Sequence, residues 1–258
     1  MDSVLCKETI DDVLIFSCKK RLGASSGIVP SHVAIAMDGN RRWATRRFMP
    51  ALVGHWKGAE AITKVVKAAR NLGIRVLTLY AFSTENWHRS QLEVSELMNV
   101  ISHYLKKHLS FMLKEGVRLG FIGDLSKLPL DLQELIHKTC ELTKDGSQID
   151  LVLALNYGGR DEICRAFKSM LNDCEKGLLK KEDISEDLIS QYLDTAQWKD
   201  PDLFIRTSGE QRLSNFLLWQ FAYTEVYITK TLWPDFNEKY LRQAVLEYQQ
   251  RERRLGGA

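Results

Sequence analysis

Residues 32–43 (HVAIAMDGNRRW) hold the side chains that could bind a phosphorylated ligand. A short apolar run at 33–37 is followed by Asp38-Gly39-Asn40 and then directly by Arg41-Arg42. An apolar run of this length, bounded by turn residues, is typical of a strand buried in a parallel sheet. The turn would end the strand and cap a helix, whose first N–H groups, with two guanidinium groups, suit a phosphate.

The carboxylate of Asp38 adds a metal-binding group to this turn. It would repel a bare phosphate, but it suits a Mg²⁺ ion carried by a diphosphate. An ordinary βα turn with a solvated arginine pair would contain the same residues, because short glycine-containing turns are common. This turn alone therefore leaves both interpretations open.

Strands and helices alternate along most of the chain. Apolar runs predict strands at 33–37, 75–82, 117–122, 149–155, 203–205 and 225–232. Helical spacing of apolar residues predicts helices at 54–72, 92–114, 131–142, 184–193 and 237–253, and another that follows Arg160 and ends near Cys174. This alternation predicts an α/β fold with a single parallel sheet of about six strands flanked by helices.

The length of 258 residues suffices for one α/β domain with a large core, and no repeat or linker divides the chain. We expect residues 1–31, with an amphipathic pattern at 11–21, to be a peripheral segment, and residues 32–258 to form the single main domain. The net charge of +3 is too small to indicate a nucleic-acid partner.

The cysteines and the N-terminal sequence give information about the cellular compartment of the protein. The five cysteines have neither a CxxC motif nor zinc-ligand spacing, which favours free thiols in a reducing compartment. No run approaches the ~18 apolar residues of a transmembrane helix. The N-terminus has neither a transit-peptide nor a signal-peptide pattern. A chain trimmed of its targeting segment would look the same, so cytoplasm and plastid both remain open.

Polar segments follow four of the predicted strands. Ligands of open parallel sheets bind where strands reach their carboxyl ends. The segments there are 38–42 with His55 further on, 83–89, 156–160 and 206–214. Together they supply arginines, hydroxyl groups and small residues, so the sequence predicts a site for two or more phosphates.

The predicted helix at 92–114 adds an apolar element to this site. Most of its apolar stripe is expected to be core. Ala81, in the second strand, would face this helix, and so small a residue could leave a groove there. A polar diphosphate site that opens onto an apolar groove suits an isoprenoid diphosphate.

At these residues the chain resembles the cis-prenyltransferase family, which includes undecaprenyl and dehydrodolichyl diphosphate synthases and plant short-chain relatives. The resemblance spans roughly residues 30–257. The DDxxD signature of the unrelated trans-prenyltransferases is absent, since Asp11-Asp12 continues as Val-Leu-Ile. The matching motifs, in order, are HVAIAMDGNRRWA, GHWKGAE, LTLYAFSTENWHRS followed by EVSELM, NYGGRDEI, DLFIRTSGEQRLSNFLLWQFAYTEVY, LWPDF and RERRLGG.

The resemblance implies roles for the matching positions. Catalytic roles fall to Asp38, Asn86 and Arg89, and Mg²⁺ would be bound by Asp38 and Glu225. In the RERRLGG tail, Arg254 and Gly256 would reach the active site across a dimer interface. The other implied substrate-binding residues are Gly39, Asn40, Arg41, Arg42, His55, Ser83, Glu85, Arg206, Arg212 and Ser214.

The resemblance further implies Mg²⁺-dependent condensation of isopentenyl diphosphate with an allylic prenyl diphosphate to give a Z-polyprenyl diphosphate. A homodimer is expected, with an apolar tunnel beside the helix at 92–114. In that helix, His103 and Tyr104 could limit chain growth. A long-chain product would favour peripheral association with a membrane.

Two departures from the family pattern keep alternatives open. Ala51 stands where many bacterial members have an arginine, four residues before His55. This change leaves room for irregular coupling of two dimethylallyl diphosphates, as in lavandulyl diphosphate synthases. At the second departure, Arg41 stands in place of a glycine, as in eukaryotic relatives. The remaining alternative is a subunit of a heteromeric dehydrodolichyl diphosphate synthase.

Overall fold

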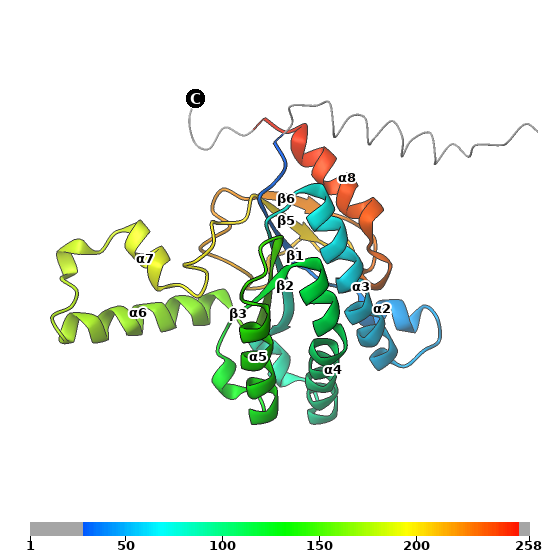
Figure 1. The fold of residues 1–258 in the computed structure, drawn as a ribbon, viewed down its shortest axis with the longest axis horizontal. Coiled ribbons are helices and arrows are strands. Elements are labelled where there is room, and N and C mark those ends of the chain that lie inside the picture. Colours follow the sequence, from blue (N-terminus) through cyan, green and yellow to red (C-terminus); the bar gives the residue numbers. More distant parts are fainter. Residues whose placement is uncertain (1–27, 253–258) are drawn as a thin grey trace, which may run out of the picture.

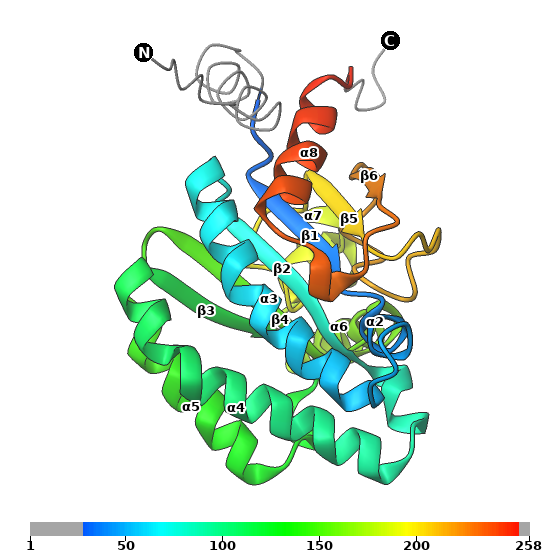
Figure 2. The same ribbon diagram turned by 90° about the vertical axis from the view of Figure 1, so that its right-hand side faces the viewer.

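A computed structural model describes residues 28–252, and these residues are built around one sheet of six parallel strands (Figures 1 and 2). The strand order is β3-β4-β2-β1-β5-β6. The strands are β1 (His32–Ala36), β2 (Val76–Ser83), β3 (Val117–Ile122), β4 (Ile149–Tyr157), β5 (Leu203–Arg206) and β6 (Glu225–Ile228).

Helices connect the strands as the sequence pattern predicts. The α-helices are α2 (Asn40–Thr45), α3 (Ala51–Leu72), α4 (Gln91–Glu115), α5 (Leu130–Thr143), α6 (Gly159–Glu175), α7 (Glu186–Tyr192) and α8 (Glu238–Gln249). Short 3-10 turns are η1 (Thr84–His88), η2 (Leu125–Lys127), η3 (Lys181–Asp183) and η4 (Trp233–Asp235). None of the helices within 28–252 is long and apolar enough to cross a membrane.

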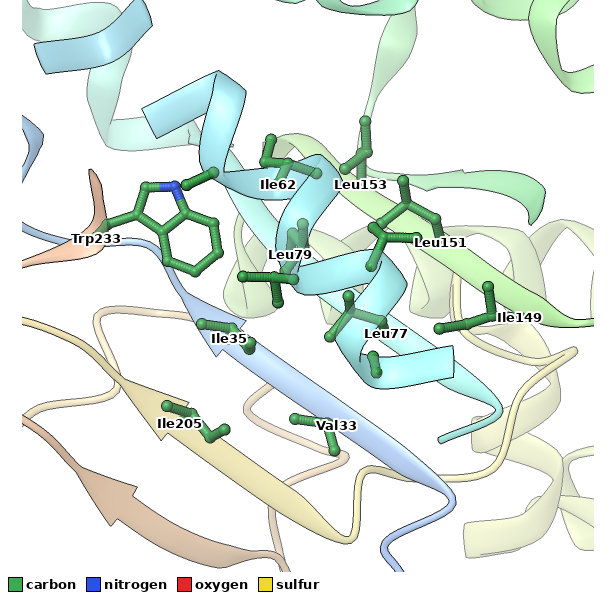
Figure 3. Packing of buried hydrophobic residues seen from close by; sticks show 14 of the residues in the cluster. Val33, Ile35, Ile62, Leu77, Leu79, Ile149, Leu151, Leu153, Ile205 and Trp233 are labelled. Carbon is green, nitrogen blue, oxygen red and sulfur yellow. The ribbon is translucent and has the colours of Figure 1, made fainter. Parts of the chain in front are cut away.

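The two faces of the sheet bury different residues of the same strand. In β1, Val33 and Ile35 belong to the larger core, under α3, α4, α5 and α8, whereas Ala34 and Ala36 belong to a smaller cluster on the other face. All four are buried, as expected of a central parallel strand with period-two side-chain alternation. Figure 3 shows the larger core, in which Ile62 and Trp233 approach the strand residues.

The second face is covered in a different way. Phe216 and Leu217, from the long connection between β5 and β6, pack there against Phe204 and Tyr157. The helices α6 and α7 lie on this side and project away from the sheet (Figure 1). The connection that carries Arg212 and Ser214 is therefore anchored by a buried apolar segment.

Strands β2 and β4 each contain one extra residue at the carboxyl end of the sheet. Tyr80 pairs with Ala154, Phe82 with Leu155, and Ser83 with Tyr157, so the register shifts twice and then recovers. The extra residues are Ala81 in β2 and Asn156 in β4, and Asn156 has a left-handed φ of 47°. These two bulges turn the local side chains at the edge where ligands of parallel sheets bind.

Several element boundaries differ from the predicted ones. Helix α3 begins at Ala51 rather than Gly54, because Pro50 provides a fixed φ of −57° at its N-cap. Strand β6 ends at Ile228 rather than 232, because its partner β5 ends at Arg206 and the chain then turns through Ser208 and Gly209, which have left-handed φ values. The amphipathic pattern at 11–21 lies outside the described residues.

We predict that His32 makes folding stability depend on pH. Its Nδ1 contacts the Lys199 carbonyl at 2.6 Å and its Nε2 contacts the Thr78 hydroxyl at 2.7 Å. Burial lowers its pKa to about 4, although the contact with the Lys199 carbonyl opposes this shift. Below pH 6.5 this imidazole is protonated in the unfolded chain, whereas in the folded protein it stays neutral down to about pH 4. The free energy of unfolding therefore falls by about 3 kcal/mol as pH falls from 6.5 to 4.

Urea unfolding at pH 7 and pH 4.5 measures this effect. Replacing His32 by Gln should lower stability at pH 7 and remove much of the difference between the two pH values. The matched control is His137→Gln, on the exposed surface of α5. An unchanged pH difference in the His32 variant would contradict the assignment.

Candidate active site

A pocket of about 830 Å³ lies at the carboxyl ends of β1, β2 and β5. It brings together three of the four segments that the strand-end argument predicted, whereas the fourth, 156–160, does not line it. The predicted site residues that line it are Asp38, Gly39, Asn40, Arg41, Arg42, His55, Ser83, Glu85, Asn86, Arg89, Arg206, Arg212 and Ser214.

An ion pair between buried Arg206 and partly exposed Asp38 lines this pocket. Arg206 is only 4% exposed, and its Nη2 donates a 2.6 Å hydrogen bond to Asp38 Oδ2. Its Nη1 donates to Ser214 Oγ at 2.9 Å and also to the Arg212 carbonyl. The Thr207 hydroxyl accepts from the Asp38 backbone N–H at 2.8 Å. These bonds join the end of β1 to the end of β5.

The second arginine of α2 faces the β5–β6 connection. Arg42 donates to Ser208 Oγ at 2.5 Å and to Glu210 Oε1 at 2.7 Å. Arg212 pairs with the other oxygen of Glu210. The carboxylate of Glu210 therefore holds two pocket arginines beside each other.

Glu93 plays the same part on the opposite side and was not predicted from the sequence. Its carboxylate accepts from Arg41 at 2.8 and 2.9 Å and from Arg89 at 2.9 Å. The backbone N–H of Glu93 donates to Ser90 Oγ, which caps the start of helix α4. The sequence signal was its place in EVSELM, which we counted among the motifs of the resemblance without assigning Glu93 a role.

His55 adds an uncharged imidazole ring to this pocket. Burial, and after it the charge of Arg89, lowers the pKa of His55 to about 4, so the ring is uncharged at neutral pH. Its Nε2 lies 3.9 Å from Glu93, beyond hydrogen-bonding distance. A neutral imidazole can donate one hydrogen bond to a phosphate without adding charge.

Three buried polar atoms of the pocket have no hydrogen-bond partner within residues 28–252. They are Asn40 Oδ1, His55 Nε2 and Arg206 Nε. An unsatisfied buried polar group costs about 1–3 kcal/mol, so such groups are rare in folded proteins. The two nitrogens, His55 Nε2 and Arg206 Nε, can donate to a ligand, and with five arginines in the same pocket they indicate a binding site for an anion.

The inner end of the pocket is apolar. It is lined by Met37, Ala81 and Phe82 from the strand side and by Leu97 from α4. This agrees with the predicted groove between Ala81 and the long helix. Deeper along α4, Tyr104 is buried in the main core, whereas His103 is exposed and packs edge-on against Trp56. An extended tunnel beside α4 remains a prediction.

Glu225 does not line the pocket of its own chain, so the structure does not place it beside Asp38 there, and its metal-binding role stays a prediction from the resemblance. It pairs with Leu203 at the amino end of β5, whereas Asp38 follows the carboxyl end of β1. Its carboxylate accepts from Arg251 at 2.8 Å. Sequence order shows that a carboxylate is near a strand, but strand register decides which edge it occupies. Arg254 and Gly256 lie outside the described residues.

Metal binding in the pocket would depend on Asp38. No group of three or more His, Cys, Asp or Glu side chains with metal-binding geometry occurs among the described residues. Asp38 uses Oδ2 for Arg206, and no donor from residues 28–252 contacts its Oδ1. Mg²⁺ commonly combines one or two carboxylates with substrate phosphates and water, so one free carboxylate oxygen fits a metal brought by a diphosphate.

The fold and site thus define an enzyme that holds diphosphate groups beside an apolar groove. A family model described as a putative undecaprenyl diphosphate synthase matches residues 36–256. The chain belongs to this family and is a cis-prenyltransferase.

Individual relatives support this assignment. The chain is 49% identical to an isoprenyl transferase of Clostridium perfringens over 89% of its length and 90% of the relative. It is similar to the crystal structure of lavandulyl diphosphate synthase from Lavandula x intermedia in complex with dimethylallyl diphosphate. That likeness has a TM-score of 0.85 and 38% identity, and covers 87% of this chain and 97% of the other. The chain is also similar to the crystal structure of a probable undecaprenyl diphosphate synthase from Campylobacter jejuni. That likeness has a TM-score of 0.74 and 35% identity, and covers 88% of this chain and 98% of the other.

Gly54 of α3 gives a testable prediction about the position of Asn40. A Cβ added at Gly54 would lie 2.0 Å from the Asn40 carbonyl oxygen, so the start of α2 must move if a side chain is present. Gly54→Ala should therefore lower the free energy of unfolding by about 1–3 kcal/mol, as overpacking does. It should also weaken diphosphate binding by displacing Asn40.

Chemical denaturation and calorimetric titration with inorganic diphosphate measure both effects. Lys64→Ala, on the exposed face of the same helix, should leave both quantities nearly unchanged. If the Gly54 variant keeps wild-type stability and wild-type diphosphate binding, the close approach of Gly54 to the Asn40 carbonyl does not hold α2 against α3.

Proposed function

We propose that this protein is a Mg²⁺-dependent enzyme that condenses isopentenyl diphosphate with an allylic prenyl diphosphate to give a Z-polyprenyl diphosphate. The observation that carries the proposal is the pocket itself, in which five arginines and Asp38 lie next to an apolar end. Two diphosphates need several guanidinium groups, and a prenyl chain needs the apolar end.

The residues divide between two substrates. Asn40, Arg42 and His55, with the Gly39 turn, are proposed to bind the allylic diphosphate. Arg206, Arg212 and Ser214 are proposed to bind isopentenyl diphosphate, since they form one hydrogen-bonded group. Holding both substrates in a reactive arrangement can contribute about 7–11 kcal/mol to barrier reduction.

The remaining groups act between these subsites. Asn86 and Arg89 are proposed to orient the reacting ends, and Arg89 is already fixed by Glu93. Asp38 would hold Mg²⁺, which neutralises charge on the departing diphosphate when bound. Arg41, Ser83 and Glu85 would complete the polar wall of the pocket.

The alternatives have weaker support. Irregular coupling of two dimethylallyl diphosphates is suggested by Ala51 and by the lavandulyl relative, but that relative is less similar in sequence than the bacterial isoprenyl transferases. A purely structural subunit would not need Asp38, Asn86, Arg89, Arg206 and Arg212 together in one pocket. The homodimer, the contribution of Arg254 and Gly256 across its interface, and peripheral membrane association stay predictions from the resemblance.

Product masses test the proposal directly. Purified protein is incubated with isopentenyl diphosphate and allylic starters of increasing length, and separately with dimethylallyl diphosphate alone. Chain extension by five-carbon units supports the proposed reaction, and the stereochemistry of the new double bond is read by NMR. A ten-carbon product from dimethylallyl diphosphate alone would support irregular coupling instead.

Asp38→Ala should lower the kcat of the folded protein on the order of 10³-fold, by comparison with the loss of one key electrostatic group at other active sites. It should also lower the melting temperature, because buried Arg206 loses its carboxylate partner. Steady-state kinetics and a thermal melt give the two readouts. Asp187→Ala, in the exposed first turn of α7, is the matched control. A folded Asp38 variant that keeps more than a tenth of wild-type activity would exclude the proposed role.

Activity should also require a divalent cation. Removing metal with excess chelator should abolish turnover, because one carboxylate and the arginines cannot by themselves replace a metal that bridges diphosphate oxygens. Adding Mg²⁺ back should restore it. Full turnover in the presence of excess chelator would be incompatible with the proposed cofactor.

A further inference from the structure

The connection from Thr207 to Leu217, here called the site loop, has unusual backbone geometry. Ser208, Ser214, Asn215 and Leu217 all have left-handed φ values, between 45° and 69°. Residues other than glycine rarely adopt this region, and each such residue stores roughly 1–3 kcal/mol of strain. The site loop therefore needs anchors that hold it in this conformation.

Asn215 is such an anchor, and it joins three segments. Its Nδ2 donates to Glu85 Oε1 at 2.7 Å, and its Oδ1 accepts from the Arg160 N–H at 2.9 Å. Its backbone carbonyl accepts from the Gly159 N–H at 2.7 Å. A Cβ at Gly158 would lie 2.6 Å from Asn215 Nδ2, so that glycine leaves the space this side chain occupies.

The contact with Glu85 joins two segments of the pocket lining, η1 and the site loop. Glu85 lies in η1, between Ser83 and Asn86, whose side chain accepts from the Ser83 N–H. On the other side, Asn215 directly follows Ser214, which is bound to Arg206. The Tyr80 hydroxyl gives a second, weaker contact to the Ser214 carbonyl at 3.4 Å.

Glu85 is an acceptor that is well suited to this contact. Burial raises the pKa of its carboxyl, but hydrogen bonds from Asn215 and neighbouring groups outweigh burial and hold the pKa below its usual value. The carboxylate is thus ionised at neutral pH, and a hydrogen bond to an ionised acceptor is stronger than one between neutral groups.

We propose that Asn215 is a positioning residue that fixes the spacing between the isopentenyl diphosphate subsite of Arg212 and Ser214 and the segment that carries Ser83 and Asn86. The inference rests on the proposed function, in which Arg212 and Ser214 bind isopentenyl diphosphate and Asn86 orients the reacting ends. Asn215 acts through Glu85 and through the backbone of the site loop. Substituting Asn215 should therefore disturb the alignment of the two substrates, which is measured as a change in kcat and in the KM for isopentenyl diphosphate.

Asn215→Asp isolates the contact with Glu85. The substitution keeps the oxygen that accepts from Arg160, but it places a second carboxylate against Glu85. We expect at least a tenfold loss of kcat/KM at pH 8, with a raised KM for isopentenyl diphosphate and a lowered kcat. The loss should shrink as pH falls towards 6, because two facing carboxylates share a proton more readily.

Glu85→Gln provides the rescue. In that background the Gln amide can donate to the new carboxylate at position 215, so Asn215→Asp should cost less than threefold. Comparing the same substitution in both backgrounds removes the direct effect of changing Glu85. Asn172→Asp, on the exposed surface of α6, is the matched control and should leave kinetics unchanged.

Asn215→Gly tests the inference if the Asp variant fails to fold. Glycine adopts the φ of 61° without strain, and both side-chain hydrogen bonds are lost. A tenfold or larger loss of kcat/KM is again expected. Unchanged kinetics in a folded variant, or an equal loss from Asn215→Asp in both backgrounds, would overturn the inference. Either result leaves the proposed function standing as long as the wild-type protein elongates an allylic starter.

Discussion

The ion pair between Arg206 and Asp38 is the interaction on which the site depends. An arginine buried to this extent must have its charge and donors matched, because an unpaired buried charge is very costly. Asp38, Ser214 and the Arg212 carbonyl match the charge and the two Nη groups, while Nε has no partner among the described residues and can donate to a ligand. The same bonds tie the end of β1 to the end of β5, so the need to stabilise one guanidinium group also assembles the pocket.

The other arginines are held by protein carboxylates in a similar way. Glu93 holds Arg41 and Arg89, and Glu210 holds Arg42 and Arg212. Without these two carboxylates, several like charges would face each other across a small volume. A diphosphate that enters the pocket must compete for guanidinium groups that are already aligned. Less ordering is then needed at binding, which favours affinity through preorganisation.

Much of the fold and part of the site could be predicted from the sequence. Alternation of apolar runs and helical patterns was enough for the parallel sheet, and parallel strands bring their carboxyl ends to one edge. Glu225 is the first residue of its strand in the sequence pattern and in the structure, so the parallel sheet places it at the amino edge, away from Asp38; its metal-binding role came only from the resemblance. Glu93 and Asn215 were missed because their roles arise from contacts between segments distant in the chain. The start of α3 and the end of β6 depended on a proline cap and on a neighbouring strand.

The paired bulges at Ala81 and Asn156 have a consequence for the evolution of this fold. Between them, Phe82 faces the helix side together with Leu155, and beyond them the original register returns. A bulge absorbs its extra residue, so losing Ala81 or Asn156 would leave the alternation of the neighbouring side chains intact and would remove only the local bend of that strand. Each extra residue can therefore be lost or gained separately. Its evolutionary trace should be a change in the direction of the segment that follows, 83–89 after β2 or 158–160 after β4, while the core residues before it stay in place.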